Sequence, residues 1–490
     1  MAAEKVDLPR GVPENPIIEN VLAMRYASRP MRRLFSAENK VIQQQDYWAQ
    51  IMQGQNDLGV NIPQSHVDDY KDVVDVVDLA QIQEKERVLR HDEKAMIETF
   101  NANAGGHEDA HRQLTSRDVS DNVEQFQNKN GLEIVRGKMV AALARQARLA
   151  TENSELVYAG RTHNAPAQPD LIGKLFANSG EELLRAYDRL EDFIDNYPMR
   201  GLKGAMGTQT DLLQLFDGDQ SKVDALERKI ADHYGFKNLL NSIGQVYPRT
   251  LDFELVSALY NVVCAPGNLA TTLRHMSGRD QYTEGFKEGQ VGSSAMPHKM
   301  NTRTLERVMG FRDIMQGYIT MAGAIAGEQW YGGDVSNSVT RRVFLPDSFF
   351  AVDGQYENFI TVLDEGGFYP AVINAEVEKY LPFLTTTRLL VAATQNGIGR
   401  ETAHAAIRDH AVATALEMRQ TGQASNDLID RLVADPRMDG VTKMQLNKAL
   451  STPIEFVGSA PTQITKFIAK VEPIVKAHPK EANYIPQPIL

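Results

Sequence analysis

Apolar residues recur three and four positions apart over long stretches of this chain, whereas the alternation typical of strands is scarce and short. The spacing predicts one long amphipathic helix between 119 and 150, and a second from about 303 to 328. The apolar positions of these two runs are Val119, Val123, Phe126, Leu132, Val135, Met139, Leu143, Val308, Phe311, Met315, Tyr318, Ala322 and Ile325. Segments 166–196 and 249–280 also favour helix, and Pro266 should kink the latter. The chain is therefore predicted to be all-α, with a central bundle of long helices.

Helical segments before 115 and after about 371 are shorter, and Pro and Gly interrupt them. We therefore predict three helical domains, covering 1–115, 116–370 and 371–490. The central domain should hold the long-helix bundle. The tail AHPKEANYIPQPIL (477–490) is predicted to be a loosely packed, Pro-containing end.

Composition narrows the class of protein. A length of 490 residues exceeds what one hydrophobic core usually organises, and a net charge of −12 argues against general binding to nucleic acid or to an anionic membrane. An anionic ligand would need a local basic cluster such as Arg25, Arg29, Arg32 and Arg33. The lone Cys264 excludes an internal disulfide framework. The sequence has no run of 18 apolar residues, so no membrane-spanning helix is predicted. With no apolar signal-peptide core at its start, the chain is expected to be cytoplasmic.

The segment from His107 to His111 matches the H-E-x-x-H pattern of zinc peptidases. That chemistry needs both histidines on one helical face, but two glycines precede the motif and Thr115 to Asp118 follow it closely. The extended pattern also fails, because Leu114 and Arg117 stand where Gly and His are required. Glu133 could supply a third ligand, so spacing alone leaves zinc open, although we predict no metal site.

Other catalytic motifs are missing from the sequence, including the phosphate-binding loop, the dinucleotide fingerprint, C-x-x-C and the nucleophile elbow. What remains is a set of polar clusters at the ends of predicted helices. These clusters are Arg90-His91-Asp92, His111 to Asp118, Thr162-His163, GSSAMPHKMN at 292–301, and Ser338 to Arg342.

The 292–301 segment resembles the G-S-S-x-M-P-x-K-x-N signature of the fumarase, aspartase and argininosuccinate lyase superfamily. Further segments resemble the adenylosuccinate lyase family: RYAS at 25–28, RHD at 90–92, LTSRDVSDN at 114–122 and DVSNSVTRR at 334–342. The resemblance implies three α-helical domains around a five-helix bundle. It also implies a carbon–nitrogen lyase that eliminates fumarate from adenylosuccinate to give AMP, and from the succinylated aminoimidazole carboxamide ribotide of purine biosynthesis. No cofactor is implied, and the expected assembly is a homotetramer whose active sites each draw on three subunits.

Five catalytic residues follow from this resemblance. By this resemblance Ser293 would be the general base, and nearby Lys299 and an electropositive site would favour the ionised form that the role requires. Sequence physics alone does not separate Ser293 from Ser294. His163 would be the general acid for the departing amine, Glu306 would pair with a catalytic histidine, and His91 would hold the substrate. The glycine-flanked loop is expected to close over the substrate.

Substrate-binding residues are also implied by the resemblance. They are Arg25, Tyr26, Arg90, Asp92, His111, Thr115, Ser116, Thr162, Gln245, Met296, Asn301, Arg307, Ser338 and Arg342. Arginines suit phosphate because they donate in pairs, and Thr115 and Ser116 would bind a fumarate carboxylate. Thr115, Ser338 and Asp334 could instead be helix caps. Gly333 stands where many relatives have an arginine, and Arg341 or an N-terminal arginine could replace that cation.

Two other classes of protein remain open beside this lyase and its sister lyases. One is a zinc peptidase that uses HEDAH, and the other is a non-catalytic helical scaffold. Arg25 and Arg342 favour a phosphorylated substrate over the small acids of aspartase or fumarase. Ser293, Lys299, His163 and Glu306 argue against a scaffold.

Overall fold

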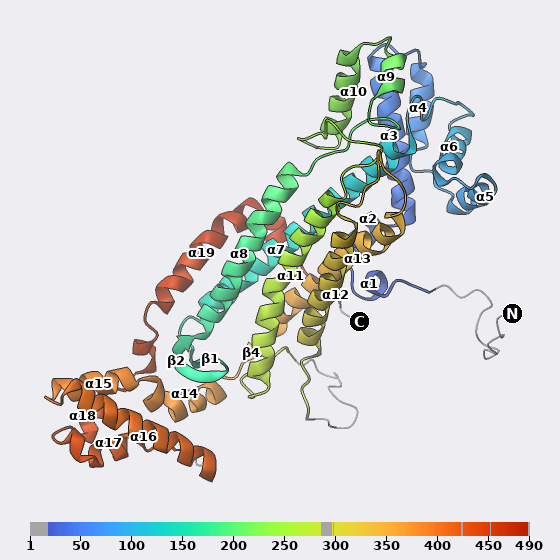
Figure 1. Cartoon of the computed structure of the whole chain (residues 1–490). Coiled ribbons are helices and arrows are strands. Elements are labelled where there is room, and N and C mark those ends of the chain that lie inside the picture. Colours follow the sequence, from blue (N-terminus) through green and yellow to red (C-terminus); the bar gives the residue numbers. More distant parts are fainter. Residues whose placement is uncertain (1–17, 286–295, 297, 423–424, 451, 489–490) are drawn as a thin grey trace, which may run out of the picture.

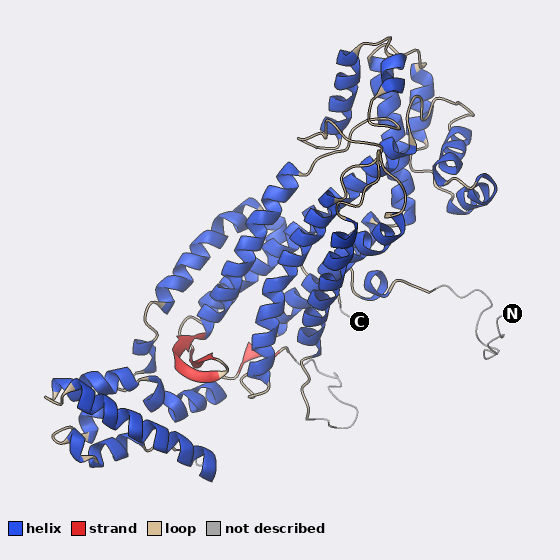
Figure 2. Ribbon diagram, in the orientation of Figure 1, coloured by secondary structure: helices blue, strands red, loops and turns tan. Residues whose placement is uncertain are grey.

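The computed structural model describes residues 18–285, 296, 298–422, 425–450 and 452–488, and this part of the chain is mainly helical (Figures 1 and 2). Two short antiparallel sheets are present in it: β1 (Val157–Thr162) with β2 (Ala165–Leu171), and β3 (Tyr282–Thr283) with β4 (Gly367–Phe368). The helices before the bundle are α1 (Val21–Arg25), α2 (Arg29–Leu34), α3 (Ala37–Asp57), α4 (Gln64–Asp72), α5 (Leu79–Leu89) and α6 (Asp92–Asn103).

Five long helices form the centre of the described structure. They are α7 (Ser116–Glu152), α8 (Ile172–Asn196), α11 (Thr250–Ser277), α12 (Arg303–Ile325) and α13 (Ser338–Glu365). Each packs on the next, in the order α7, α8, α11, α12, α13 and back to α7, so the five close into a ring (Figure 1). Two short helices, α9 (Thr210–Leu215) and α10 (Gln220–His233), stand at one end. The predicted all-α fold with a central bundle is confirmed.

Three of the predicted long helices agree closely with the structure. Residues 119–150 lie within α7, residues 303–325 form α12, and α11 runs through Pro266 without interruption. The prediction for 166–196 was wrong at its start, where residues up to Leu171 form β2. Pro166 and Pro169 explain the difference, because a residue before proline favours extended backbone.

Helix α13 has no amphipathic pattern that would have marked it in the sequence. None of its residues from 344 to 363 is exposed, and even Ser348, Asp353, Gln355 and Glu357 are buried. A helix that is buried on all sides loses the polar face on which periodicity analysis depends.

The C-terminal helices divide between two cores. They are α14 (Pro370–Leu384), α15 (Thr386–Gln395), α16 (Arg400–Thr421), α17 (Leu428–Ala434), α18 (Lys443–Lys448), α19 (Ala460–Ala477) and α20 (Pro479–Ala482), with 3₁₀ turns η1 (Pro436–Met438) and η2 (Pro453–Phe456). Residues of α15 to α18 form a separate apolar cluster that includes Leu389, Ile407 and Leu432. In contrast, α19 returns to pack against α7 and α8 (Figure 1). The predicted domain boundaries stay predictions.

The C-terminal tail is held against the bundle, so the prediction of a loosely packed end was wrong. The hydroxyl of Tyr484 donates to the buried carboxylate of Glu357 at 2.5 Å, and Lys138 forms ion pairs with Glu357 and Asp353. The Arg29 amide donates to the Gln487 side chain at 3.1 Å. The prolines correctly predicted an irregular backbone for the tail. The sequence did not reveal the buried charged residues of the bundle that bind the tail.

Candidate active site

Most of the predicted substrate-binding residues lie at one end of the bundle, in a group that we name the arginine–histidine cluster. Its members are Arg90, His91, Asp92, His111, Thr115, Ser116, Gln245, Ser338 and Arg342. They come from the α5–α6 junction, the N-terminus of α7, the segment before α11 and the N-terminus of α13. Arg342 lies 3.9 Å from Asp92, and both side chains are more than half exposed, so this ion pair is weak.

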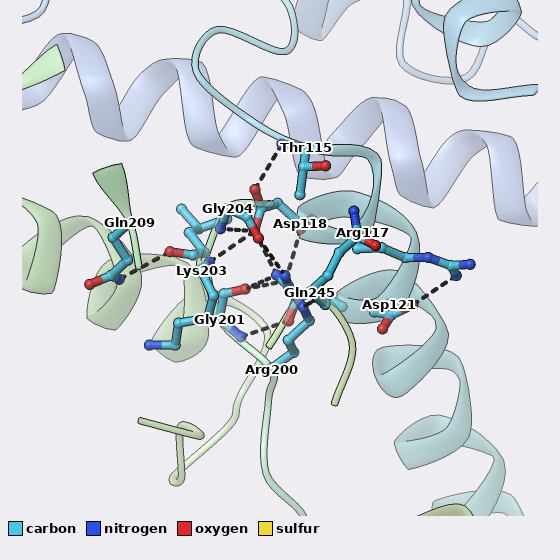
Figure 3. A network of polar contacts seen from close by, with 12 residues as sticks. Thr115, Arg117, Asp118, Asp121, Arg200, Gly201, Lys203, Gly204, Gln209 and Gln245 are labelled. Atoms are coloured by element: carbon cyan, nitrogen blue, oxygen red, sulfur yellow. Dashed lines mark hydrogen bonds and ion pairs between the residues drawn. The ribbon is translucent and has the colours of Figure 1, made fainter. Parts of the chain in front are cut away.

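Asp118 organises the centre of this cluster (Figure 3). Its buried carboxylate accepts hydrogen bonds from the Thr115 amide at 2.9 Å and from the Lys203 amide at 2.8 Å. It also pairs with the fully buried guanidinium of Arg200 at 2.5 Å. Arg200 in turn donates to the Gln245 carbonyl at 2.9 Å. This network fixes the start of α7, and with it Thr115 and Ser116, relative to the segment that carries Gln245.

The two histidines of the cluster are oriented by hydrogen bonds. The His91 Nδ1 accepts from the Lys94 amide at 3.2 Å as the N-cap of α6, so Nε2 is the atom that would contact a substrate. The His111 Nδ1 accepts from the Trp48 indole at 3.1 Å. Burial lowers the pKa of His111, an effect that the nearby Asp118 charge opposes. A neutral His111 with Nδ1 as acceptor carries its proton on Nε2, and can donate it to a substrate oxygen.

The H-E-x-x-H segment does not form the helix that a zinc peptidase needs. Residues 107–109 have no regular secondary structure, residues 110–111 form a turn, and His111 has a positive φ of 70°. His107 pairs with Asp69 at 2.7 Å, whereas His111 accepts a hydrogen bond from Trp48, so the two rings contact different residues and do not share a ligand site. Among the described residues, no group of three or more His, Cys, Asp or Glu is arranged to hold a metal ion.

Arg341 does not stand in for the arginine that many relatives have at Gly333. Its guanidinium is buried and pairs with Glu124 and with Asp252, the latter at 2.6 Å. Gly333 has φ of 130°, and a Cβ there would meet a Val246 methyl at 2.6 Å. The backbone at this position therefore requires glycine, and the proposal that Arg341 replaces the missing cation was wrong.

Arg25 and Tyr26 lie beside the middle of the bundle. Arg25 ends α1, which packs on α13. The Tyr26 ring meets Phe311 edge to face at 5.2 Å between ring centres. Because Phe311 follows Arg307 by one helical turn on α12, Tyr26 lies on the face of α12 that Arg307 shares.

Three predicted catalytic residues, His163, Lys299 and Glu306, lie at the opposite end of the bundle from His91, in a group that we name the hairpin–loop cluster. Thr162 and His163 are at the tip of the β1–β2 hairpin. Lys299 and Asn301 line a cavity of about 490 Å³, together with Glu284 and Tyr369. Met296 is exposed. Ser293 and Ser294 lie outside the described residues, so the base and the closing loop stay predictions.

Glu284 fastens the start of α12 to this end. Its largely buried carboxylate accepts hydrogen bonds from the amides of Thr304 and Leu305 at 2.9 and 3.0 Å. A carboxylate at a helix N-terminus also interacts favourably with the helix dipole. The next residue, Glu306, pairs with Arg274 at 3.4 Å, and no ion pair with a histidine is present for it among the described residues.

A single copy of the chain keeps the two clusters far apart. Ser116 begins α7, and the hairpin follows its last turn after a short connection. Because α7 has 37 residues, its ends are separated by roughly 55 Å. Figure 1 shows the hairpin and α5–α6 toward opposite ends of the long helices. No small substrate can touch both clusters of one chain.

Sequence reasoning missed several residues that support the site. Asp118 carried a usable signal, because T-x-x-D at 115–118 has the form of an N-terminal capping motif. Arg200, Glu284 and Trp48 carried none, since their partners are distant in sequence. The predicted site residues themselves stay predictions, with positions that the structure now supplies.

Comparison with solved structures supports the fold, and a family model defines the class of protein. The 3-carboxy-cis,cis-muconate lactonizing enzyme from Pseudomonas putida superposes with a TM-score of 0.79 at 16% identity, covering 93% of this chain and 99% of that one. A fumarate lyase from Mesorhizobium sp. BNC1 gives a TM-score of 0.76 at 17% identity, covering 93% and 100%. A family model described as "Lyase" matches residues 64–314. The fold and this match define a lyase.

Sequence comparison identifies the family. A model described as "Adenylosuccinate lyase C-terminus" matches residues 382–467. The adenylosuccinate lyase of Schistosoma mansoni is 31% identical, over 94% of this chain and 96% of its own. The adenylosuccinate lyase of Saccharomyces cerevisiae is 29% identical, over 92% and 93%. The chain belongs to the adenylosuccinate lyase family.

Proposed function

We propose that this protein is an adenylosuccinate lyase, which eliminates fumarate from adenylosuccinate to form AMP and acts likewise on the succinylated aminoimidazole carboxamide ribotide. The observation that carries the proposal is the 31% identity to an adenylosuccinate lyase over 94% of the chain. The proposed activity belongs to purine biosynthesis. A cytoplasmic location is part of the proposal, with the single Cys264 in keeping with a reducing compartment. Of the described helices, none is long and apolar enough to cross a membrane.

The proposed reaction needs a base, an acid and a site for negative charge. Ser293 removes a proton from the succinyl carbon next to a carboxylate, and the electron pair is delocalised onto that carboxylate. Lys299 and Asn301 donate to the charge that develops there. The carbon–nitrogen bond then breaks, and His163 gives a proton to the departing purine amine. Fumarate and AMP are released with atoms and charge balanced.

The arginine–histidine cluster supplies the groups for substrate recognition. The phosphate is bound by Arg342, Ser338, Arg25, Tyr26 and Arg307, because guanidinium groups suit phosphate. His91 and His111 contact phosphate or succinyl oxygens, and Thr115 and Ser116 bind a carboxylate of the fumarate portion. Arg90, Asp92, Thr162, Gln245 and Met296 complete the binding residues, and Glu306 pairs with a catalytic histidine.

A complete site in this proposal is assembled from several copies of the chain, as a homotetramer in which three subunits contribute to each site. Support comes from the roughly 55 Å between the ends of α7, which keeps the two clusters of one chain apart. Antiparallel association of two bundles would place the hairpin–loop cluster of one copy beside the arginine–histidine cluster of another. For the same reason Glu306 would meet its histidine only across an interface.

Ultraviolet absorbance of the purified protein with adenylosuccinate, with and without a chelator, tests the activity. Turnover that the chelator does not change is expected, and chelator-sensitive turnover would contradict a mechanism without metal. Assembly is tested by mixing the His163→Ala and Arg342→Ala variants after partial denaturation and refolding. If sites are shared, the mixture regains activity that neither variant has alone. A mixture as inactive as its components would refute the shared site.

A further inference from the structure

The β1–β2 turn that carries His163 has an uncommon backbone. His163 and Asn164 both have positive φ, at 51° and 59°, and Thr162 pairs with Ala165 across a two-residue turn. Hairpins favour this geometry, but it suits Gly, Asn and Asp better than histidine. A positive φ on a non-glycine residue is held by its surroundings. The question is which groups hold this turn.

Two arginines donate hydrogen bonds to Asn164. Arg161 Nη1 donates to the Asn164 carbonyl at 2.8 Å, and Arg279 donates to the Asn164 side-chain oxygen. Both arginines line a cavity of about 780 Å³ beside the hairpin, and Thr162 and Asn164 also reach it. The turn is therefore fastened to the segment between α11 and β3 through Arg279.

Glu376 joins this arrangement from α14, a helix that packs against β1 and β2. One carboxylate oxygen pairs with Arg161. The other accepts from the side chain of Gln281 at 2.6 Å, and Gln281 is only 2% exposed. The side chains of Arg161 and Glu376 are 18% and 15% exposed. Because Gln281 directly precedes β3, Glu376 connects the histidine turn to the strand that leads toward the predicted loop.

Charge explains why a carboxylate is needed at this point. Burial lowers the pKa of Arg279, and the positive charge of Arg161 lowers it further, whereas Glu376 acts in the opposite direction. Without Glu376, the guanidinium groups of Arg161 and Arg279, which both donate to Asn164, would lose the carboxylate charge that offsets their repulsion. Repulsion between these two charges would weaken their hydrogen bonds to Asn164 and loosen the turn.

We propose that Glu376 is a positioning residue for His163, acting through Arg161 and Gln281 to hold the β1–β2 turn in place. This inference rests on the proposed function, in which His163 is the general acid. Glu376 does not touch the substrate in this role. It keeps the imidazole at the distance that proton transfer requires, and a displacement of about 1 Å can reduce a rate about 10²-fold.

Kinetics of the full-length Glu376→Ala, Glu376→Gln and Glu378→Ala variants test the proposal. Glu378 is an exposed neighbour on α14 and serves as the matched control. We expect kcat to fall about 30- to 100-fold in Glu376→Ala, with KM changed less than about threefold. The kcat of Glu376→Gln should lie between those of Glu376→Ala and the wild type, since an amide oxygen can still accept a hydrogen bond from Arg161. A kcat within about twofold of wild type in Glu376→Ala, or an equal loss in Glu378→Ala, would overturn the proposal.

A double-variant cycle separates positioning from general loss of structure. Arg161→Met should lower kcat by a similar factor, and the Arg161→Met/Glu376→Ala protein should lose little more than either single variant. Fully multiplicative losses would show that the two residues act independently, against the proposal.

Hydrogen exchange gives a readout that does not depend on activity. The backbone amides of residues 158–165 should exchange faster in Glu376→Ala than in wild type or Glu378→Ala, while α7 keeps its protection. Unchanged exchange in this peptide would refute the positioning role. If the wild-type protein failed to convert adenylosuccinate, the proposed function would fall while this comparison still decided the role of Glu376.

Discussion

Replacement of Asp118 by asparagine tests the network under the arginine–histidine cluster. Asp118→Asn keeps the size of the side chain but removes its charge. The Arg200 guanidinium, fully buried and paired at 2.5 Å, would then have no carboxylate in contact. The amide NH₂ of the new side chain would also face either Arg200 or the Thr115 amide, and all of these groups donate hydrogen bonds.

The structure sets the size of the effect. Removing one partner of a buried ion pair destabilises a protein by about 3–5 kcal/mol, because a buried charge is left uncompensated. The arrangement around Asp118 fits that case, since both partners are fully buried. With a shift of about 2–4 °C per kcal/mol for domains of 150–250 residues, the melting temperature should fall by about 6–20 °C. Turnover should fall as well, because Thr115 and Ser116 begin the helix that Asp118 fixes.

Circular dichroism at 222 nm, recorded at a fixed scan rate and protein concentration, measures the change. Asp188→Asn is the control, because Asp188 lies exposed on α8, and its melting temperature should stay within about 1 °C of wild type. If Asp118→Asn melted within about 2 °C of wild type, the buried pair would not be stabilising the start of α7, and the reasoning would be refuted.

Three further predictions concern stability. Burial, with the charge of Asp92, raises the pKa of Glu93 from 4.5 to about 8, so the stability present below pH 4.5 is lost as pH rises to about 8. Glu93→Gln should flatten melting temperature against pH over this window; a parallel curve would contradict this. Gly333→Ala should destabilise the protein by about 1–3 kcal/mol, as urea unfolding would show, because its Cβ meets Val246; an unchanged midpoint would refute the steric argument. Tyr484→Phe should cost about 1–3 kcal/mol by removing the donor to Glu357, and should speed proteolysis of the tail; equal proteolysis rates would contradict this.

Local periodicity predicted four of the five bundle helices but did not predict α13. Helices α11 and α12 each expose one face and bury another, so their apolar residues recur at helical spacing. In α13, no residue from 344 to 363 is exposed, which removes that contrast. At the start of α8, the two prolines of β2 gave a signal against helix that the longer pattern obscured.

The sequence predicted site residues only where they lie in short contiguous motifs. The motifs at 90–92, 114–122 and 334–342 fall together at one end of the bundle. The groups that hold them do not show in the sequence, because Asp118 and Arg200 are 82 positions apart and Arg161 and Glu376 are 215 apart. Only the fold brings such residues into contact. The same holds for the distance between the two clusters, which depends on the length of α7.

The most direct test of the central claim is to follow adenylosuccinate by proton NMR in the presence of the purified protein and of its His163→Ala variant. The account predicts that the wild-type protein forms fumarate and AMP in equal amounts, and that His163→Ala is slower by about 10²- to 10⁴-fold while it keeps the wild-type melting temperature. An unchanged substrate spectrum with folded wild-type protein would contradict the proposed function. Wild-type rates in His163→Ala would contradict the assignment of the acid.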